Sequence, residues 1–256
     1  MKKLLLILLC SPMIGFGQLT YVPDDNFEEY LEDYVFGYGF NNDDSVSTTH
    51  VLNTTTLTFN RNIFNSLRYL VNCTGLESFT NLETLEFAAS WSWSGYLDLQ
   101  YLDVSGLINL KNLTLQWISQ LSSLYLSSNV ALEVLDISYV NLTTIYLSGA
   151  TSLDSAIFTG VNLTTLDLSH NPSLTSLICY HNNSLTSLDV SNAPSLSYLD
   201  CHTNLSLTSL DVSNTPSLSY LDCYDNSLLT SLDVSNTPAL SHLNCSSNSS
   251  LTSLDL

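Results

Sequence analysis

Residues 185–256 repeat one unit of 22 residues three times and then begin it again. The copies read LTSLDVSNAPSLSYLDCHTNLS from Leu185, LTSLDVSNTPSLSYLDCYDNSL from Leu207 and LTSLDVSNTPALSHLNCSSNSS from Leu229, and the last one stops after LTSLDL. A fixed period of this length is typical of a solenoid. Within each unit the motif L-x-x-L-x-(L/V/C) occurs twice. Because its apolar positions alternate, each half of the unit is predicted to form a short strand with one buried face.

The same period extends back to Leu99, with intervals of 21 or 22 residues. A single unit would bury roughly six apolar side chains at about 1.5–3 kcal/mol each. It must also order its backbone, at roughly 1–2 kcal/mol per residue. Only a stack, in which each coil covers its neighbours, can be stable. We therefore predict an α/β repeat solenoid of parallel strands over residues 57–256, with an incomplete last repeat.

The N-terminal residues differ from the repeats. Residues 1–17, MKKLLLILLCSPMIGFG, have the basic start, short apolar run and small residues of a secretory signal peptide. Residues 18–56 are predicted to form a short helical cap that starts at Asp24 or Asp25. One face of this helix would cover the first coil with apolar residues at helical spacing: Phe27, Tyr30, Leu31 and Tyr34. The chain is thus expected to be exported, secreted or at the cell surface, without membrane insertion after signal removal.

The charge of the chain restricts its partners. Loss of Lys2 and Lys3 with the signal peptide takes the formal charge from −19 to −21, and no Lys or Arg follows Lys111. Nucleic-acid binding requires a basic footprint, so no nucleic-acid partner is expected. The acidity either keeps an exported protein soluble or attracts cations and basic partners.

Two columns of residues recur with the repeat, and both are interpreted as structural. Cysteines occupy the inward third apolar position, where they would stack as buried free thiols: Cys179, Cys201, Cys223 and Cys245. Asparagines follow at a fixed offset: Asn182, Asn204, Asn226 and Asn248. Earlier coils carry Ile118, Val140 and Val161 at the asparagine position, and their turns are expected to differ. No cysteine spacing fits a zinc site, and no metal site is predicted.

The third, fifth and seventh positions of the cysteine-bearing strands should point outward. They place aromatic and acidic residues on one face, which is the candidate ligand-binding surface: Tyr180, Tyr198, Asp200, His202, Tyr220, Asp222 and Tyr224. Tyrosine is enriched at binding surfaces because it offers a large contact area at low entropic cost. Simple duplication of one repeat would produce the same pattern.

The other half-motif stacks a column of aspartates: Asp167, Asp189, Asp211, Asp233 and Asp255. Such a column could hold divalent cations, but the LDxSN context favours hydrogen bonds to the turn backbone. The acidic loop at 41–45 resembles a calcium loop but lacks its spaced ligands. No cofactor is therefore predicted. The insertion SWSWSGY at 90–96 could stack on a sugar or a partner side chain, or pack on the flank.

The alternating LxxLDVSNxP and LxxLxCxxN halves resemble the internalin-type leucine-rich repeats of bacterial surface proteins, in the subgroup with cysteine at this strand position. The resemblance covers about residues 21–256. It implies a curved solenoid at the cell surface whose concave strand face binds a ligand or mediates adhesion.

Catalysis has little support in the sequence. The five histidines occupy different motif positions and have no partner at the spacing of a catalytic triad. The predicted function is an exported binding module for an unknown protein or glycan. One alternative is a stalk that displays a C-terminal domain absent from this sequence. The other is a β-helix polysaccharide lyase, although the Arg or Lys often used there as the base is missing after Lys111.

Overall fold

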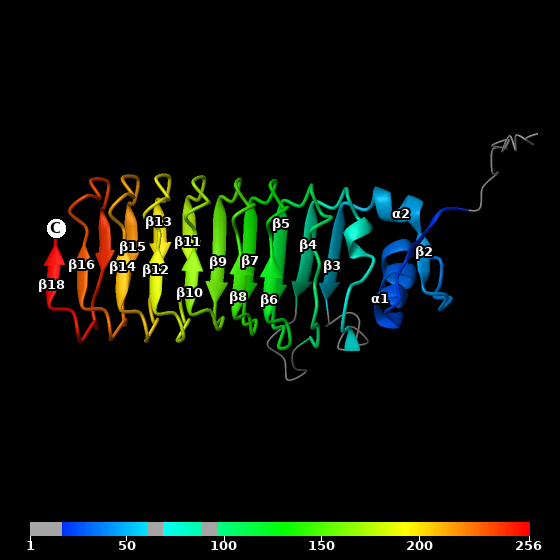
Figure 1. Cartoon of the computed structure of the whole chain (residues 1–256), viewed down its shortest axis with the longest axis horizontal. Coiled ribbons are helices and arrows are strands. Elements are labelled where there is room, and N and C mark those ends of the chain that lie inside the picture. Colours follow the sequence, from blue (N-terminus) through cyan, green and yellow to red (C-terminus); the bar gives the residue numbers. More distant parts are fainter. Residues whose placement is uncertain (1–16, 61–68, 89–96) are drawn as a thin grey trace, which may run out of the picture.

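The computed structural model describes residues 17–60, 69–88 and 97–256. Its strands stack side by side along the long axis, with helices α1 and α2 at the N-terminal end and strand β18 at the other end (Figure 1). Residues 1–16 of the predicted signal peptide and the aromatic insertion at 90–96 lie outside the described residues. The parallel strands and their 22-residue period confirm the predicted repeat solenoid.

The larger sheet contains nine parallel strands, one per coil, in the order β17-β15-β13-β11-β9-β7-β5-β4-β3. Its register places the same motif position of successive coils side by side, as Leu199 pairs with Leu177 and Leu221. These leucines are buried, so one face of the sheet forms the core. The strands are β3 (Thr56–Asn60), β4 (Thr84–Ala88), β5 (Asn112–Gln116), β7 (Val134–Ser138), β9 (Ser155–Thr159), β11 (Ser176–Ile178), β13 (Tyr198–Asp200), β15 (Tyr220–Asp222) and β17 (His242–Asn244).

The other half-motif forms shorter parallel strands on the opposite side of the coils, in the groups β6-β8, β10-β12-β14 and β16-β18. Each coil is therefore flattened between two layers of strands, and leucines from both layers, such as Leu188 and Leu199, fill the space between them. The strands are β6 (Ser123–Tyr125), β8 (Thr144–Tyr146), β10 (Thr165–Asp167), β12 (Ser187–Asp189), β14 (Ser209–Asp211), β16 (Ser231–Asp233) and β18 (Ser253–Asp255).

The N-terminal segment forms a separate cap. Strand β1 (Leu19–Tyr21) pairs antiparallel with β2 (Ser45–Ser47), and helix α1 (Asp25–Glu29) continues as the π-helical segment η1 (Tyr30–Phe36). The side chain of Asp24 caps α1, because its Oδ1 accepts hydrogen bonds from the backbone N–H groups of Asn26 and Phe27, each at 3.1 Å. Helix α2 (Thr48–Asn53) leads into the first coil, and a short 3-10 turn, η3 (Leu76–Ser78), follows later.

The helix of the cap covers the first coil through three of its four predicted apolar residues. Phe27, Tyr30 and Leu31 are buried, and the Tyr30 ring stacks on Phe59 of β3 with centroids 4.4 Å apart. The prediction was wrong for Tyr34, which is 51% exposed. The wider π-helical turn that begins at Tyr30 shifts position 34 off the buried face.

The asparagine column is a buried hydrogen-bond ladder that ties neighbouring coils together. The Asn204 Nδ2 donates to the carbonyl oxygens of Cys179 and Cys201, at 2.9 and 2.8 Å. Its Oδ1 accepts from the backbone N–H of Asn182 at 2.8 Å. The same three bonds recur at the other members: Asn182, Asn226 and Asn248. Each asparagine side chain thus replaces backbone partners that the sharp turn removes.

The turn itself does not depend on asparagine. The residue before the ladder position has a positive φ in every described coil from 117 onward: Trp117, Tyr139, Gly160, His181, Thr203, Asp225 and Ser247. The expectation that the turns before Ile118, Val140 and Val161 differ was therefore wrong. These aliphatic side chains are buried and fill the same space. What the earlier coils lose is the hydrogen bonding, not the left-handed turn.

Candidate functional site

The predicted ligand-binding residues lie on the outer face of β11, β13, β15 and β17 and on the turns that follow them. We call this surface the tyrosine–aspartate patch, made up of Tyr180, Tyr198, Asp200, His202, Tyr220, Asp222, Tyr224 and also His242 and Asn244. The parallel register sets Tyr198 beside Tyr220 and Asp200 beside Asp222. Residues 22 apart in the sequence are thereby neighbours on the surface.

Two columns of stacked rings run across these coils. In the first, the Tyr220 ring lies between Tyr198 and His242, with centroid distances of 4.5 and 4.3 Å and nearly parallel planes. In the second, Tyr180 stacks on His202 at 4.6 Å, and the ring of His181 meets His202 edge-on at 5.7 Å. Neighbouring parallel strands lie about 4.8 Å apart, which matches the stacking distance of aromatic rings. The coil spacing therefore builds the columns without further adjustment.

The two carboxylates lie between the columns, and each has its own partner. Asp200 Oδ1 is 2.5 Å from His202 Nδ1. Both oxygens of Asp222 accept from the Asn244 amide, at 3.2 and 3.1 Å, and its Oδ1 also accepts from the backbone of Tyr224 at 2.9 Å. These contacts offset the repulsion between stacked carboxylates and fix their orientation.

Partial burial, and next the Asp200 carboxylate, raise the pKa of the Tyr198 phenol. This phenol therefore stays neutral at physiological pH and can donate a hydrogen bond. The patch offers ring faces, fixed acceptors and hydroxyl donors within one surface. Such an arrangement suits non-covalent recognition.

The aspartates of the opposite layer bind the turn backbone. The Oδ1 atoms of Asp167, Asp189, Asp211 and Asp233 each accept from the backbone N–H of the serine two residues later, at 2.9 Å. The serine hydroxyl bond is the largest cause of the lowered pKa of Asp167 and Asp233. This is the structural role that the LDxSN context favours. Within residues 17–60, 69–88 and 97–256, no group of three or more His, Cys, Asp or Glu side chains could hold a metal ion.

A second ladder on the side of β6 to β18 was missed in the sequence. The buried Asn129 donates to the carbonyl oxygens of Val104 and Leu107, and Asn171 donates to those of Leu147 and Ala150. The equivalent position holds alanine at 150 and 193, and threonine at 215 and 237. The alternation of residue types hides the column, although the offset of 21 or 22 residues between its members could have revealed it.

The cysteine column is a set of free thiols in the described structure. Cys179, Cys201 and Cys223 are buried, and Cys245 in the last coil is partly exposed. Burial raises the pKa of Cys201 well above its ordinary value and that of Cys223 to about 12. Since the thiolate is the reactive form, these thiols should be inert in the folded chain.

Alkylation with iodoacetamide at pH 8 tests this expectation. In the folded protein, Cys245 should react first, whereas Cys179, Cys201 and Cys223 should stay unmodified until denaturant is added. Peptide mass spectrometry after timed quenching measures each site separately. Rapid modification of Cys201 without denaturant would contradict the buried column.

Comparisons with known proteins place the fold. No family model and no curated protein sequence matches the chain. The functional domain of InlJ from Listeria monocytogenes, which includes a cysteine ladder, is 26% identical over 93% of this chain and 61% of that chain, with a TM-score of 0.48. A Leptospira interrogans leucine-rich-repeat protein is 21% identical over 73% of this chain and 57% of that chain, with a TM-score of 0.47.

The structure of a TLR13–ssRNA13 complex gives a TM-score of 0.52 at 20% identity, over 82% of this chain and 38% of that chain. The chain thus spans less than two thirds of the length of each of these three structures. Among the described residues, no helix has the length and apolar character needed to cross a bilayer. The predicted resemblance is confirmed: the chain has the leucine-rich-repeat fold and is similar to an internalin that carries a cysteine ladder.

Proposed function

We propose that the chain is an exported, non-enzymatic binding module that acts at a bacterial surface and recognises its partner through the tyrosine–aspartate patch. The observation that carries this proposal is the pair of stacked aromatic columns on either side of Asp200 and Asp222. Side chains held in this way lose little conformational freedom when a partner binds, so more of the contact energy contributes to affinity.

The chemistry of the patch favours a protein partner with exposed Arg or Lys residues. Aromatic faces attract cations, and a guanidinium between the columns would also meet a carboxylate. The formal charge of −19 for the whole sequence adds long-range attraction for a basic surface. The same charge disfavours RNA, the ligand in the TLR13 complex.

A capture experiment tests the proposal. The native chain is immobilised and exposed to a panel of extracellular proteins of both charges and to neutral and anionic glycans. The triple variant Tyr198→Ala/Asp200→Ala/Tyr220→Ala removes the centre of the patch. The matched control is Tyr125→Ala/Tyr146→Ala, which removes an exposed stacked pair, 4.8 Å apart, from the opposite layer of strands. Circular dichroism verifies that both variants are folded.

We expect a basic protein to be captured by the native chain and the control, and capture by the patch variant to fall by about tenfold or more. Binding should also weaken with salt, because the attraction between exposed charges is screened. Equal capture by all three proteins would place recognition elsewhere on the solenoid. If the native chain captures nothing from the panel, the binding function is contradicted and the role of a stalk is favoured.

A further inference from the structure

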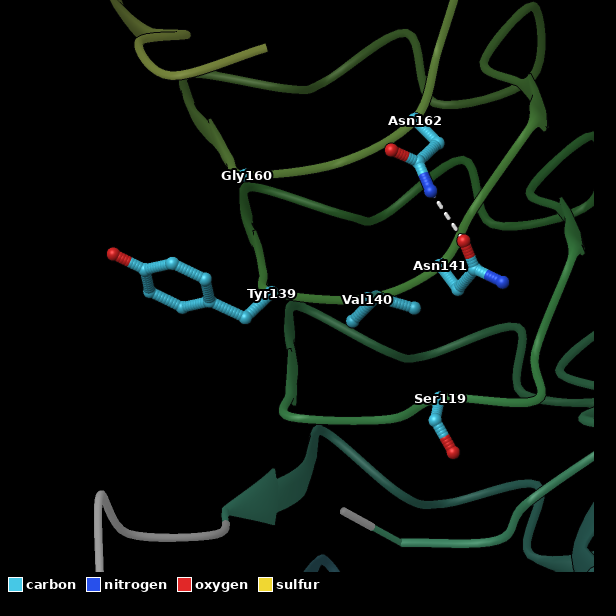
Figure 2. A pocket seen from close by; sticks show the side chains of 6 residues that line it. All are labelled: Ser119, Tyr139, Val140, Asn141, Gly160 and Asn162. Carbon is cyan, nitrogen blue, oxygen red and sulfur yellow. Dashed lines mark hydrogen bonds between the residues drawn. The ribbon is translucent and has the colours of Figure 1, made fainter. Parts of the chain in front are cut away.

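A groove separate from the tyrosine–aspartate patch lies on the turns that follow β5, β7 and β9. It has a volume of ≈ 290 Å³ and is lined by residues of three consecutive coils: Ser119, Tyr139, Val140, Asn141, Gly160 and Asn162. Figure 2 shows the Tyr139 side chain projecting from one end and the amides of Asn141 and Asn162 facing each other at the other end. The groove therefore has an aromatic end and a polar end.

The aromatic end depends on a glycine. Tyr139 stacks on Trp117 of the preceding coil, with ring centroids 4.1 Å apart and planes within 11°. Its other face is turned towards Gly160, where an added Cβ atom would lie 2.9 Å from Tyr139 Cδ1. Among the described members of this left-handed column, Gly160 alone has no side chain. One face of the Tyr139 ring is consequently left without a side-chain partner at that position.

The polar end presents complementary hydrogen-bonding groups. The Asn162 Nδ2 donates to Asn141 Oδ1. This arrangement leaves the Asn141 Nδ2 group as a donor and the Asn162 Oδ1 as an acceptor, on neighbouring coils. Both asparagines are exposed, and the hydroxyl of Ser119 lines the same groove. A ligand hydroxyl, which both donates and accepts, could bind both amides.

An unpaired backbone donor also belongs to this groove. Farther along the solenoid, the N–H at the ladder position donates to the asparagine of the next coil, as Val161 N donates to Asn182 Oδ1 at 2.8 Å. Val140 is followed by Val161, which offers no such oxygen. Among the described residues, the Val140 N–H has no hydrogen-bond acceptor. Buried backbone donors are nearly always paired, so this one calls for a partner.

We infer that the groove is a binding site for a neutral sugar residue. The C–H groups of a pyranose face pack on the Tyr139 ring, while its hydroxyls bind the amides of Asn141 and Asn162 and the Val140 N–H. No charged side chain lines the groove, which selects against anionic sugars and basic peptides. Its volume is just below the roughly 300–1,000 Å³ of typical small-molecule sites, which suits a single ring unit.

Titration of the native chain tests this inference. The probes are the methyl glycosides of glucose, galactose, mannose and N-acetylglucosamine, followed by isothermal titration and by amide resonances of the ¹⁵N-labelled protein. We expect at least one to bind with a Kd on the order of 1 mM, equivalent to about −4 kcal/mol. Binding should shift the Val140 amide resonance, because that N–H gains an acceptor.

Four variants locate the site. Tyr139→Ala and the double variant Asn141→Ala/Asn162→Ala should each weaken binding by about tenfold or more. Tyr139→Phe keeps the ring and should bind like the native chain. Tyr198→Ala lies in the tyrosine–aspartate patch and should also bind normally, so failure of the proposed function and failure of this site are distinguishable. The inference is overturned if no probe binds at about 10 mM, tenfold above the expected Kd, or if Tyr139→Ala binds unchanged.

Discussion

Replacing Asn204 by alanine should lower the free energy of unfolding by about 3–5 kcal/mol. The Asn204 side chain makes three buried bonds, to the carbonyl oxygens of Cys179 and Cys201 and from the N–H of Asn182. The two carbonyls keep a second donor, since Asn182 also binds Cys179 and Asn226 also binds Cys201. The Asn182 N–H keeps none and becomes an orphaned buried donor, which makes it the largest single part of the expected loss.

Equilibrium unfolding in urea measures this loss, and Asn183→Ala is its control. Asn183 directly follows a ladder residue in the same kind of turn, but it is exposed and has no printed ladder role in the structure, so its removal should cost less than about 0.5 kcal/mol. A loss below about 1 kcal/mol for Asn204→Ala, near the net value of one hydrogen bond, would show that the ladder adds little to stability.

The features predictable from the sequence are those that repeat. Leu199 and Cys201 could be assigned to the core because the same residue types return every 22 positions, and only an inward position requires that constancy. The side-by-side placement of Tyr198 and Tyr220 follows from the same period, since equal coils stack in register. Repetition thus supplied the fold and the location of the patch.

Features that occur once could not be predicted in the same way. The exposure of Tyr34 results from a local change in helical winding, which the spacing of apolar residues does not encode. The groove at Gly160 depends on one missing side chain beside Tyr139 and on an aliphatic residue at one ladder position. Such a site is a departure from the repeat. The repeat alone therefore predicts the regular surface around it but not the groove.

The partners of Asp200 and Asp222 were likewise beyond the sequence. Asp200 is held by His202 of its own strand end, whereas the equivalent Asp222 is held by Asn244 of the next coil. Near-identical repeats thus produce different contacts, because each carboxylate responds to the one or two residues that duplication left different. The patch is for this reason less uniform than its pattern of residues.

The second large effect is expected at the junction between the cap and the first coil. Phe59 is fully buried, and its ring contacts Tyr30 of the cap at 4.4 Å and Phe87 of the next coil at 4.3 Å. Phe59→Ala removes both stacks and leaves a cavity in the core, so it should lower the free energy of unfolding by about 3–5 kcal/mol. Because each coil contacts only its neighbours, the loss should concentrate at the N-terminal end.

Native-state hydrogen exchange distinguishes a local loss from a global one. In Phe59→Ala, amides of α1 and η1 should lose protection, whereas those of β13 and β15 should exchange at the native rate. Tyr21→Ala, at a side chain that is 63% exposed, should leave both regions unchanged. Equal loss of protection from the cap to β15 would mean that the solenoid unfolds as one cooperative unit. In that case the cap would stabilise every coil, and the Asn204→Ala effect should reach the cap as well.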